Sequence, residues 1–210
     1  MKKSCTYCAN GNGETDDHIP PKGFFQKKLP NNAQLITVPC CENCREKNQQ
    51  DDGFIRNLFC SFWKTETHLV VETDVAHRRN RSFLCDRNLA QQQGDILVLV
   101  DRHTPSGIYV GTELFYDLDK PIIDRFIERT CRAVLFDAFK LSYFSARFEW
   151  QKNPSMPQNI PTSFKQRNIL DVFHYLAIPT SKNENYWVIL TFYKGFRIWG
   201  KFETMAKIID

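Results

Sequence analysis

The chain has 210 residues, of which 42% are hydrophobic and 25% charged, with a formal net charge of +4 at pH 7. These values are ordinary for a globular protein. Such a small positive charge is compatible with a polyanionic partner but does not require one, so any case for nucleic-acid binding must come from a site. Phenylalanine occurs 17 times, which predicts a core built largely from aromatic rings.

Targeting and membrane signals are absent from the sequence pattern. Met1, Lys2 and Lys3 are followed by polar residues rather than by an apolar signal segment. Nowhere does an apolar run approach the length that spans a bilayer. We therefore expect a cytoplasmic protein without a membrane partner, and we expect Cys60, Cys85 and Cys131 to be buried free thiols.

The N-terminal quarter predicts two strands followed by a helix. Residues 16–19 favour a short strand that stops at Pro20, residues 22–32 a loop, and residues 34–38 a second strand. Residues 41–62 favour a helix, because apolar residues recur on one face at helical spacing. These apolar positions are Phe54, Ile55, Leu58, Phe59 and Phe62.

The remainder of the chain predicts a mixed α+β region. Residues 64–94 give no clear assignment, and the apolar run 95–100 favours a strand, with a helix as the alternative. Residues 120–143 predict a long helix whose first turn holds Pro121. Residues 153–161 hold three prolines and predict a surface loop. Strands are predicted at 172–178, 186–193 and 196–202, with a tight turn at Lys194-Gly195. We expect an α+β fold with one region at 1–62 and a second at 63–210.

Two Cys-x-x-Cys pairs indicate a structural zinc site. Such a pair can direct both sulfurs toward one ion, and two pairs complete a tetrahedral shell. Cys5 and Cys8 form the first pair, and Cys41 and Cys44 form the second. Cys40 competes with Cys41 for the shell, but Cys41 keeps the two-residue spacing.

An Asp-His dipeptide lies between the cysteine pairs. Asp17 can bind a hard divalent cation such as Mg²⁺, and His18 can deprotonate a water molecule, because the ordinary pKa of histidine is close to neutral pH. A metal ion opposite that water can stabilise charge on a phosphate. These are the components of phosphodiester hydrolysis, and they require a second metal ligand from a neighbouring element.

The order of motifs resembles the HNH endonuclease family. The matching segments lie within residues 5–59: Cys-x-x-Cys, Asp17-His-Ile-Pro-Pro-Lys22, a second Cys-x-x-Cys after Leu-Ile-Thr-Val-Pro, and Asp51-Asp-x-Phe-Ile-Arg56. The resemblance implies a ββα-metal module at residues 1–62 that cuts DNA with Mg²⁺ or Mn²⁺ and is held by zinc. It also implies that His18 is the general base, Asp17 a metal ligand and Asn32 the residue that braces the loop.

Arg45 departs from the family pattern. Family members commonly carry Asn or His here as the other metal ligand, whereas a guanidinium has only donors and cannot bind a cation. Asn48, one turn further along the helix, and Asp51 or Asp52 are alternative ligands. Otherwise the ion is held by Asp17 and water while Arg45 contacts phosphate, or catalysis has been lost.

The sequence therefore predicts an HNH-type endonuclease, and the family's occurrence in phage defence and mobile elements suggests a context. The alternative is a zinc-stabilised module that binds nucleic acid or protein without cleaving. Lys22, Arg45, Arg78, Arg79 and Arg81 are candidate DNA contacts. We expect the region 63–210 to confer substrate choice, homo-oligomerisation or docking to a partner protein.

Overall fold

The N-terminal part of the chain folds as two strands and a helix. The computed structural model describes residues 4–8, 11–31, 33–62, 65, 67–118, 120–142, 145–152, 163–180 and 185–204. Its first elements are β1 (Thr15–Ile19), η1 (Lys22–Phe24), β2 (Ile36–Cys40) and α1 (Glu42–Phe59). β1 and β2 are antiparallel, with Asp17 opposite Val38 and His18 opposite Thr37. The predicted strand–strand–helix order is confirmed.

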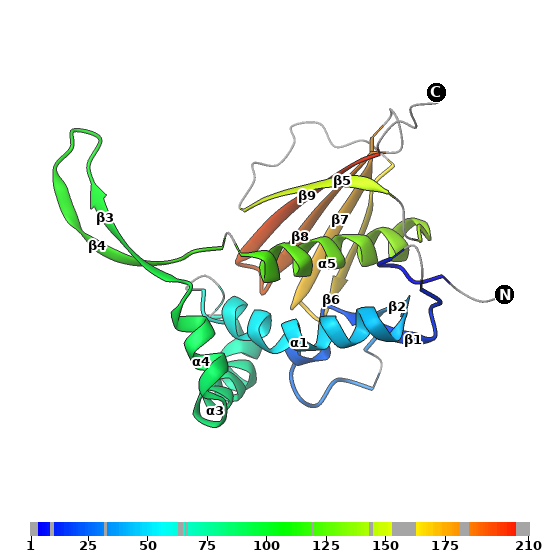
Figure 1. The fold of residues 1–210 in the computed structure, drawn as a ribbon, viewed down its shortest axis with the longest axis horizontal. Coiled ribbons are helices and arrows are strands. Elements are labelled where there is room, and N and C mark those ends of the chain that lie inside the picture. Colours follow the sequence, from blue (N-terminus) through cyan, green and yellow to red (C-terminus); the bar gives the residue numbers. More distant parts are fainter. Residues whose placement is uncertain are drawn as a thin grey trace.

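Helices and a projecting hairpin occupy the middle of the chain. Three helical elements come first: η2 (Val71–Val75), α3 (Ala76–Cys85) and α4 (Arg87–Gly94). β3 (Leu97–His103) and β4 (Tyr109–Tyr116) then pair as an antiparallel ribbon that extends away from the rest of the molecule (Figure 1). The strand predicted at 95–100 is thus confirmed, two residues late, and β4 was not predicted.

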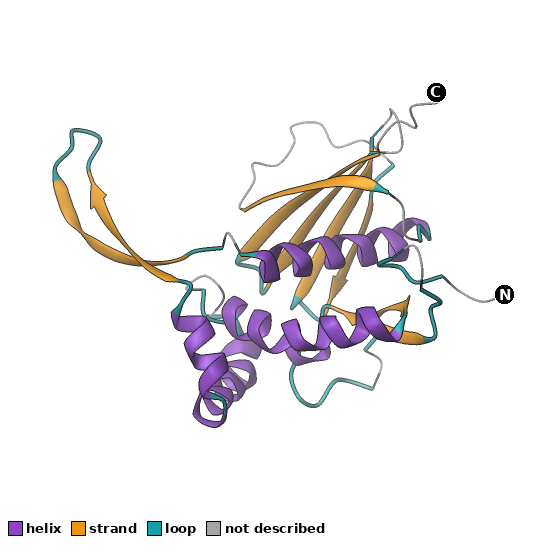
Figure 2. Ribbon diagram, in the orientation of Figure 1, coloured by secondary structure: helices purple, strands orange, loops and turns teal. Residues whose placement is uncertain are grey.

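The C-terminal part forms a five-stranded antiparallel sheet with a long helix on one face (Figure 2). The helix α5 (Pro121–Phe139) starts with the predicted Pro121. The strand order is β5-β9-β8-β7-β6. The strands are β5 (Ala146–Lys152), β6 (Lys165–Ile169), β7 (Phe173–Pro179), β8 (Tyr186–Phe192) and β9 (Phe196–Thr204). The last three match the predicted strands, whereas the predicted loop at 153–161 lies outside the described residues.

One aromatic core joins the two predicted regions. Phe24 of η1 stacks on Phe126 of α5 with ring centroids 5.8 Å apart. Phe59 of α1 lies 4.9 Å from Phe192 of β8 and 4.7 Å from Phe196 of β9. Since α5 packs against α1 and β2 as well as the sheet, residues 1–62 share their core with residues 63–210, and the boundary itself stays a prediction.

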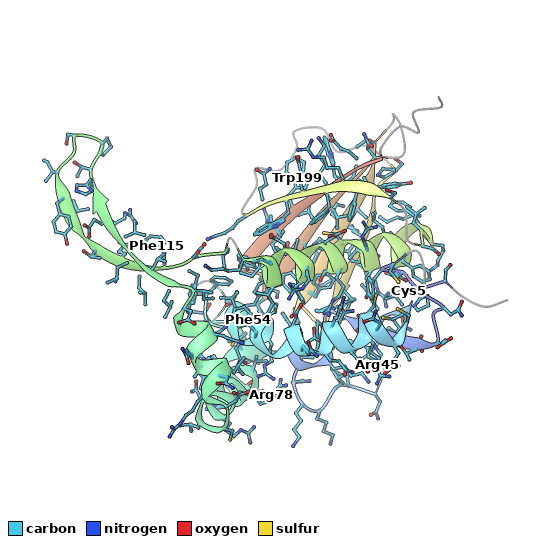
Figure 3. All side chains as sticks on the ribbon, viewed as in Figure 1. Cys5, Arg45, Phe54, Arg78, Phe115 and Trp199 are labelled. Carbon is cyan, nitrogen blue, oxygen red and sulfur yellow. The ribbon has the colours of Figure 1, made fainter. Side chains whose placement is uncertain are left out.

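Figure 3 draws the side chains on the ribbon, with Arg78 labelled on the outer helix α3. The sequence expectation for one cysteine of this helix is wrong. Cys60 and Cys131 are buried as predicted, but Cys85 is exposed at the end of α3. No residue of α3 is fully buried, because this helix lies on the outside of the molecule. Among the helices of the described part of the chain, none is long and apolar enough to cross a membrane.

Candidate functional site

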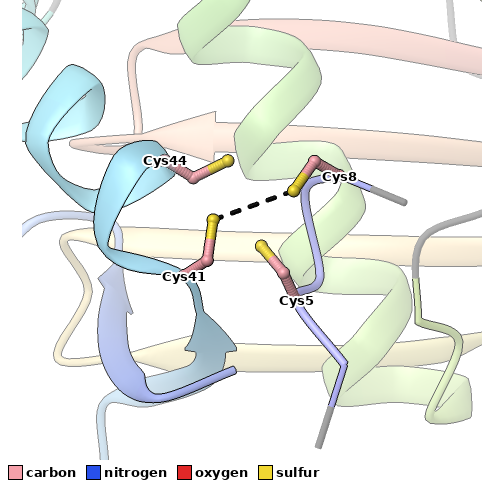
Figure 4. Close-up of side chains that lie close together, drawn as sticks. All are labelled: Cys5, Cys8, Cys41 and Cys44. Atoms are coloured by element: carbon pink, nitrogen blue, oxygen red, sulfur yellow. Dashed lines mark hydrogen bonds between the residues drawn. The ribbon is translucent and has the colours of Figure 1, made fainter. Parts of the chain in front are cut away.

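The four cysteines of the two pairs converge at the start of α1 (Figure 4). Cys5 and Cys8 come from the N-terminal segment, Cys41 caps α1 and Cys44 lies in its first turn. Their sulfur atoms all lie within 4.8 Å of one another, and the Cys8 and Cys41 sulfurs are 3.7 Å apart. Sulfurs bound tetrahedrally to zinc at about 2.3 Å are about 3.8 Å apart. The cluster could therefore hold a metal ion such as zinc.

Main-chain hydrogen bonds close the N-terminal segment around the cluster. The Cys5 N–H donates to the Gly11 carbonyl at 2.8 Å, and the Thr6 N–H donates to the Pro39 carbonyl at 2.9 Å. Gly11 approaches the sulfurs closely: a Cβ there would lie 2.6 Å from Cys41 Cβ and 2.7 Å from its Sγ. Only glycine fits this position without moving the cysteines.

The protein environment supports thiolate character at Cys5. Burial raises its pKa, but N–H groups of Cys41, Tyr7 and Cys8 directed at the sulfur outweigh that effect and hold the pKa below its ordinary value. Cys40 lies outside the cluster, where its thiol donates to the Cys41 carbonyl. Burial raises the pKa of Cys40 and of Cys44 alike, so only the position of the sulfurs separates Cys40 from the cluster. The geometry thus favours Cys41 over Cys40 as the fourth ligand.

Asp17 projects from β1 toward α1. Its Oδ2 atom accepts a hydrogen bond from the Tyr7 hydroxyl at 2.9 Å and another from the Asn48 side-chain amide at 3.0 Å. Asp17 and Asn48, two of the predicted metal ligands, are therefore in direct contact. Arg45, nearly one turn earlier on a similar face of α1, forms an exposed ion pair with Glu42 instead.

His18 is held by the neighbouring strand. Its Nδ1 atom lies 3.2 Å from Thr37 Oγ1 on β2. Burial, followed by the positive charge of Lys22, lowers the pKa of His18 below its ordinary value, which favours the neutral imidazole. When Nδ1 carries the proton and donates it to Thr37, the unprotonated Nε2 is available as a base.

The other proposed ligands are placed differently. Asp52 pairs with Arg129 of α5 at 2.6 Å, so its carboxylate is already neutralised and the structure does not favour it as a metal ligand. Asp51 pairs with Arg125 at 3.0 Å. Arg45 forms an exposed ion pair with Glu42 at 3.6 Å. Asn32 lies outside the described residues.

The basic cluster predicted to contact DNA falls on α3, and its arginines differ in exposure. Arg78 is only 18% exposed and binds Asp74 and the Phe25 carbonyl, so its guanidinium is largely engaged within the protein. Arg79 donates to Ser61 at 2.9 Å. Arg81 is exposed, as is Lys22 of η1, so these two remain accessible to a polyanion.

Three residues that shape the site were not predicted from the sequence. Tyr7 lies within the first Cys-x-x-Cys pair. Its hydroxyl, which needs a hydrogen-bond partner when buried, was the only sign in the sequence that it contributes to the site. Thr37 could be assigned only from the strand register, which the long 22–32 loop does not fix. Arg129 of α5 is buried near Asp17 and Asp52, and these two carboxylates raise its pKa against the effect of burial.

No protein-family model, curated protein or solved structure matches this chain. The functional assignment therefore depends on the geometry of the site.

Proposed function

We propose that this protein is a metal-dependent, HNH-type endonuclease that hydrolyses DNA phosphodiester bonds, with a structural zinc ion in the four-cysteine cluster. The observation that carries the proposal is the contact between Asp17 of β1 and Asn48 of α1, beside His18 and next to the cluster. Strand, strand and helix occur in the order that the resemblance implies.

Asp17 and Asn48 fit a hard divalent ion. Oxygen ligands of Mg²⁺ lie at about 2.0–2.1 Å, so adjacent ligands of an octahedral site are about 3 Å apart. The Nδ2 atom of the Asn48 amide lies 3.0 Å from the Oδ2 atom of Asp17. The oxygen and nitrogen of a side-chain amide exchange places by rotation about the terminal bond, which would present two oxygens to an ion. Asn48 thereby replaces the ligand that Arg45 cannot supply.

The remaining groups have separate roles. Neutral His18 takes a proton from the attacking water, and Thr37 fixes the orientation of its ring. Arg45, at the exposed start of α1, is available to contact a phosphate. A Mg²⁺ or Mn²⁺ ion bound beside Asp17 would stabilise the charge that develops on the phosphate and the leaving oxygen.

One observation favours a second candidate, a zinc-stabilised binding module without cleavage. Asp17 is satisfied within the protein by Tyr7 and Asn48, and its carboxylate lies near enough to Arg129 to help raise the pKa of that guanidinium against the effect of burial. Both candidates include zinc, so zinc content does not separate them. Dependence on a second, hard cation does.

The test is cleavage of supercoiled plasmid by the zinc-loaded protein with Mg²⁺ or Mn²⁺. Wild type should nick the plasmid, and His18→Ala should lower the rate at least about 100-fold, the usual contribution of a general base. His77→Ala, which removes an exposed histidine of α3, should cleave at the wild-type rate. DNA binding without cleavage by the wild type would instead favour the binding module.

A further inference from the structure

The β3–β4 ribbon carries an apolar surface that the rest of the described chain does not cover. Among the described strands, β3 and β4 pair only with each other, and Figure 1 shows the ribbon projecting from the body. We call residues 97–116 the arm. Its large exposed apolar side chains are Val98, Leu99, Val100, Ile108, Tyr109, Val110, Leu114 and Phe115.

Both faces of the arm are apolar near its root. Residues directly opposite in a ladder share a face, and successive residues alternate. Val98 opposes Phe115 on one face, whereas Leu99 opposes Leu114 on the other. Leu99 is 74% exposed and Leu114 is 59% exposed. A two-stranded ribbon is only marginally stable on its own, so this geometry requires an additional packing surface.

The charge of the arm argues against nucleic acid as that surface. A two-stranded ribbon can enter the major groove of DNA, but it does so with basic side chains that neutralise phosphates. The charged residues of the arm are Asp101, Arg102 and Glu113, and Arg102 pairs with Glu113 at 2.8 Å. With two acidic residues and one basic residue, the arm has no positive charge to offer a phosphate backbone.

We propose that the arm is the dimerisation element of this protein and that its partner is the arm of a second copy. The eight exposed apolar residues lie on both faces of the arm and together expose about 800 Å². A second arm that wraps around both faces would therefore bury the area typical of one partner in a standard interface.

The chain also carries a surface that matches the arm. A groove of about 570 Å³ lies where the arm joins the body. Its apolar lining is formed by Phe62, Leu97, Leu114, Phe115 and Phe196. In a two-fold dimer each copy contributes the same patch, so each arm can lie across the root of the other. Edge strands related by a two-fold axis perpendicular to their sheet run antiparallel, as β3 and β4 already do.

Light scattering after size exclusion tests the proposal on the full chain. Wild type should elute at twice the 24.7 kDa chain mass. Leu99→Glu and Leu114→Glu each place a charge in the interface and should weaken the dimer at least about 30-fold, the effect of a hot-spot residue. Leu84→Glu is the matched control, because Leu84 is 84% exposed on α3, and it should remain dimeric.

Both arm leucines are exposed, so each variant should melt at the wild-type temperature, which shows that its fold is intact. If one variant fails to fold, the other alone still tests the dimer. Amide exchange of β3 and β4 should be slower in the wild type than in the monomeric variants. A wild-type chain that stays monomeric up to about 100 μM, far above the micromolar limit expected for such an area, overturns the proposal and leaves the arm to a different protein. Dimers that survive both arm substitutions also overturn it.

Discussion

The side-chain amide of Asn48 on α1 lies 3.0 Å from the carboxylate of Asp17 on β1. The proposed resemblance would place a metal ligand three positions earlier, where this chain has Arg45. Three residues correspond to nearly one helical turn, so Asn48 reaches a similar face of α1 at a different height. The proposed ligand pair is therefore built from two elements, the strand β1 and the helix α1.

Replacing Thr37 tests how His18 is oriented. Thr37→Val keeps the β-branched shape that suits β2 but removes the hydroxyl 3.2 Å from His18 Nδ1. We expect plasmid cleavage to fall about 10-fold, a part of what the general base contributes, with unchanged melting. Thr37→Ser should restore the rate. Equal cleavage by wild type and Thr37→Val would exclude this positioning role.

Removal of one zinc ligand should destabilise the N-terminal region. Structural zinc supplies on the order of 10 kcal/mol of binding free energy to folding, so Cys44→Ser should lose zinc and melt at a much lower temperature. Cys85→Ser alters an exposed cysteine outside the cluster and should do neither. Zinc content by atomic emission and thermal melting give both readouts. A Cys44→Ser protein with full zinc and wild-type melting would contradict the assignment.

Gly11 offers an independent test of the same cluster. A Cβ at this position would clash with Cys41, so Gly11→Ala should lower both zinc retention and thermal stability. Gly53→Ala is the control within α1, where a Cβ has no neighbour within 4 Å. That change should stabilise the protein by about 0.5–1 kcal/mol, because alanine favours helix over glycine. Denaturant unfolding measures the stability of both variants, and atomic emission measures their zinc content. Equal stability of the two variants would be incompatible with the close approach of Gly11 to Cys41.

The Asp52–Arg129 pair connects α1 to α5 inside the protein. Arg129 is 5% exposed, and Arg129→Met leaves the Asp52 carboxylate half-buried without its partner. We expect a loss of about 3 kcal/mol in the free energy of unfolding. Arg147→Met breaks the pair with Glu149 on β5, where both side chains are exposed, at 68% and 52%, so the loss should be below about 1 kcal/mol. Similar losses in urea unfolding would show that burial does not distinguish these pairs.

Elements with one-sided burial were predictable from the sequence. The apolar stripe of α1 and the Pro121 start of α5 indicated those helices, and the turn at Lys194-Gly195 indicated the hairpin of β8 and β9. β4 was missed because its apolar residues are exposed on both faces, which leaves no alternating pattern. β6 was missed because its sequence, Lys-Gln-Arg-Asn-Ile, is that of a polar edge strand.

The four clustered cysteines could be predicted from the sequence, whereas the other contacts of the site could not. Their spacing alone brings sulfurs in pairs to one ion, and the four predicted sulfurs do converge. Which of Asn48, Asp51 and Asp52 would contact Asp17 was not predictable. It depends on the phase of α1 relative to β1, and on α5, which engages Asp51 and Asp52 from more than 70 residues away in the chain.

Direct Mn²⁺ binding tests the central claim, that Asp17 and Asn48 together hold a catalytic ion. The free Mn²⁺ signal would be followed by electron paramagnetic resonance with zinc-loaded wild type, Asp17→Ala, Asn48→Leu and the control Asn88→Leu on the exposed face of α4. We predict one bound ion in wild type and control, with affinity at least about 10-fold weaker in Asp17→Ala and Asn48→Leu. No Mn²⁺ binding by wild type, or equal binding by all four proteins, would contradict the claim.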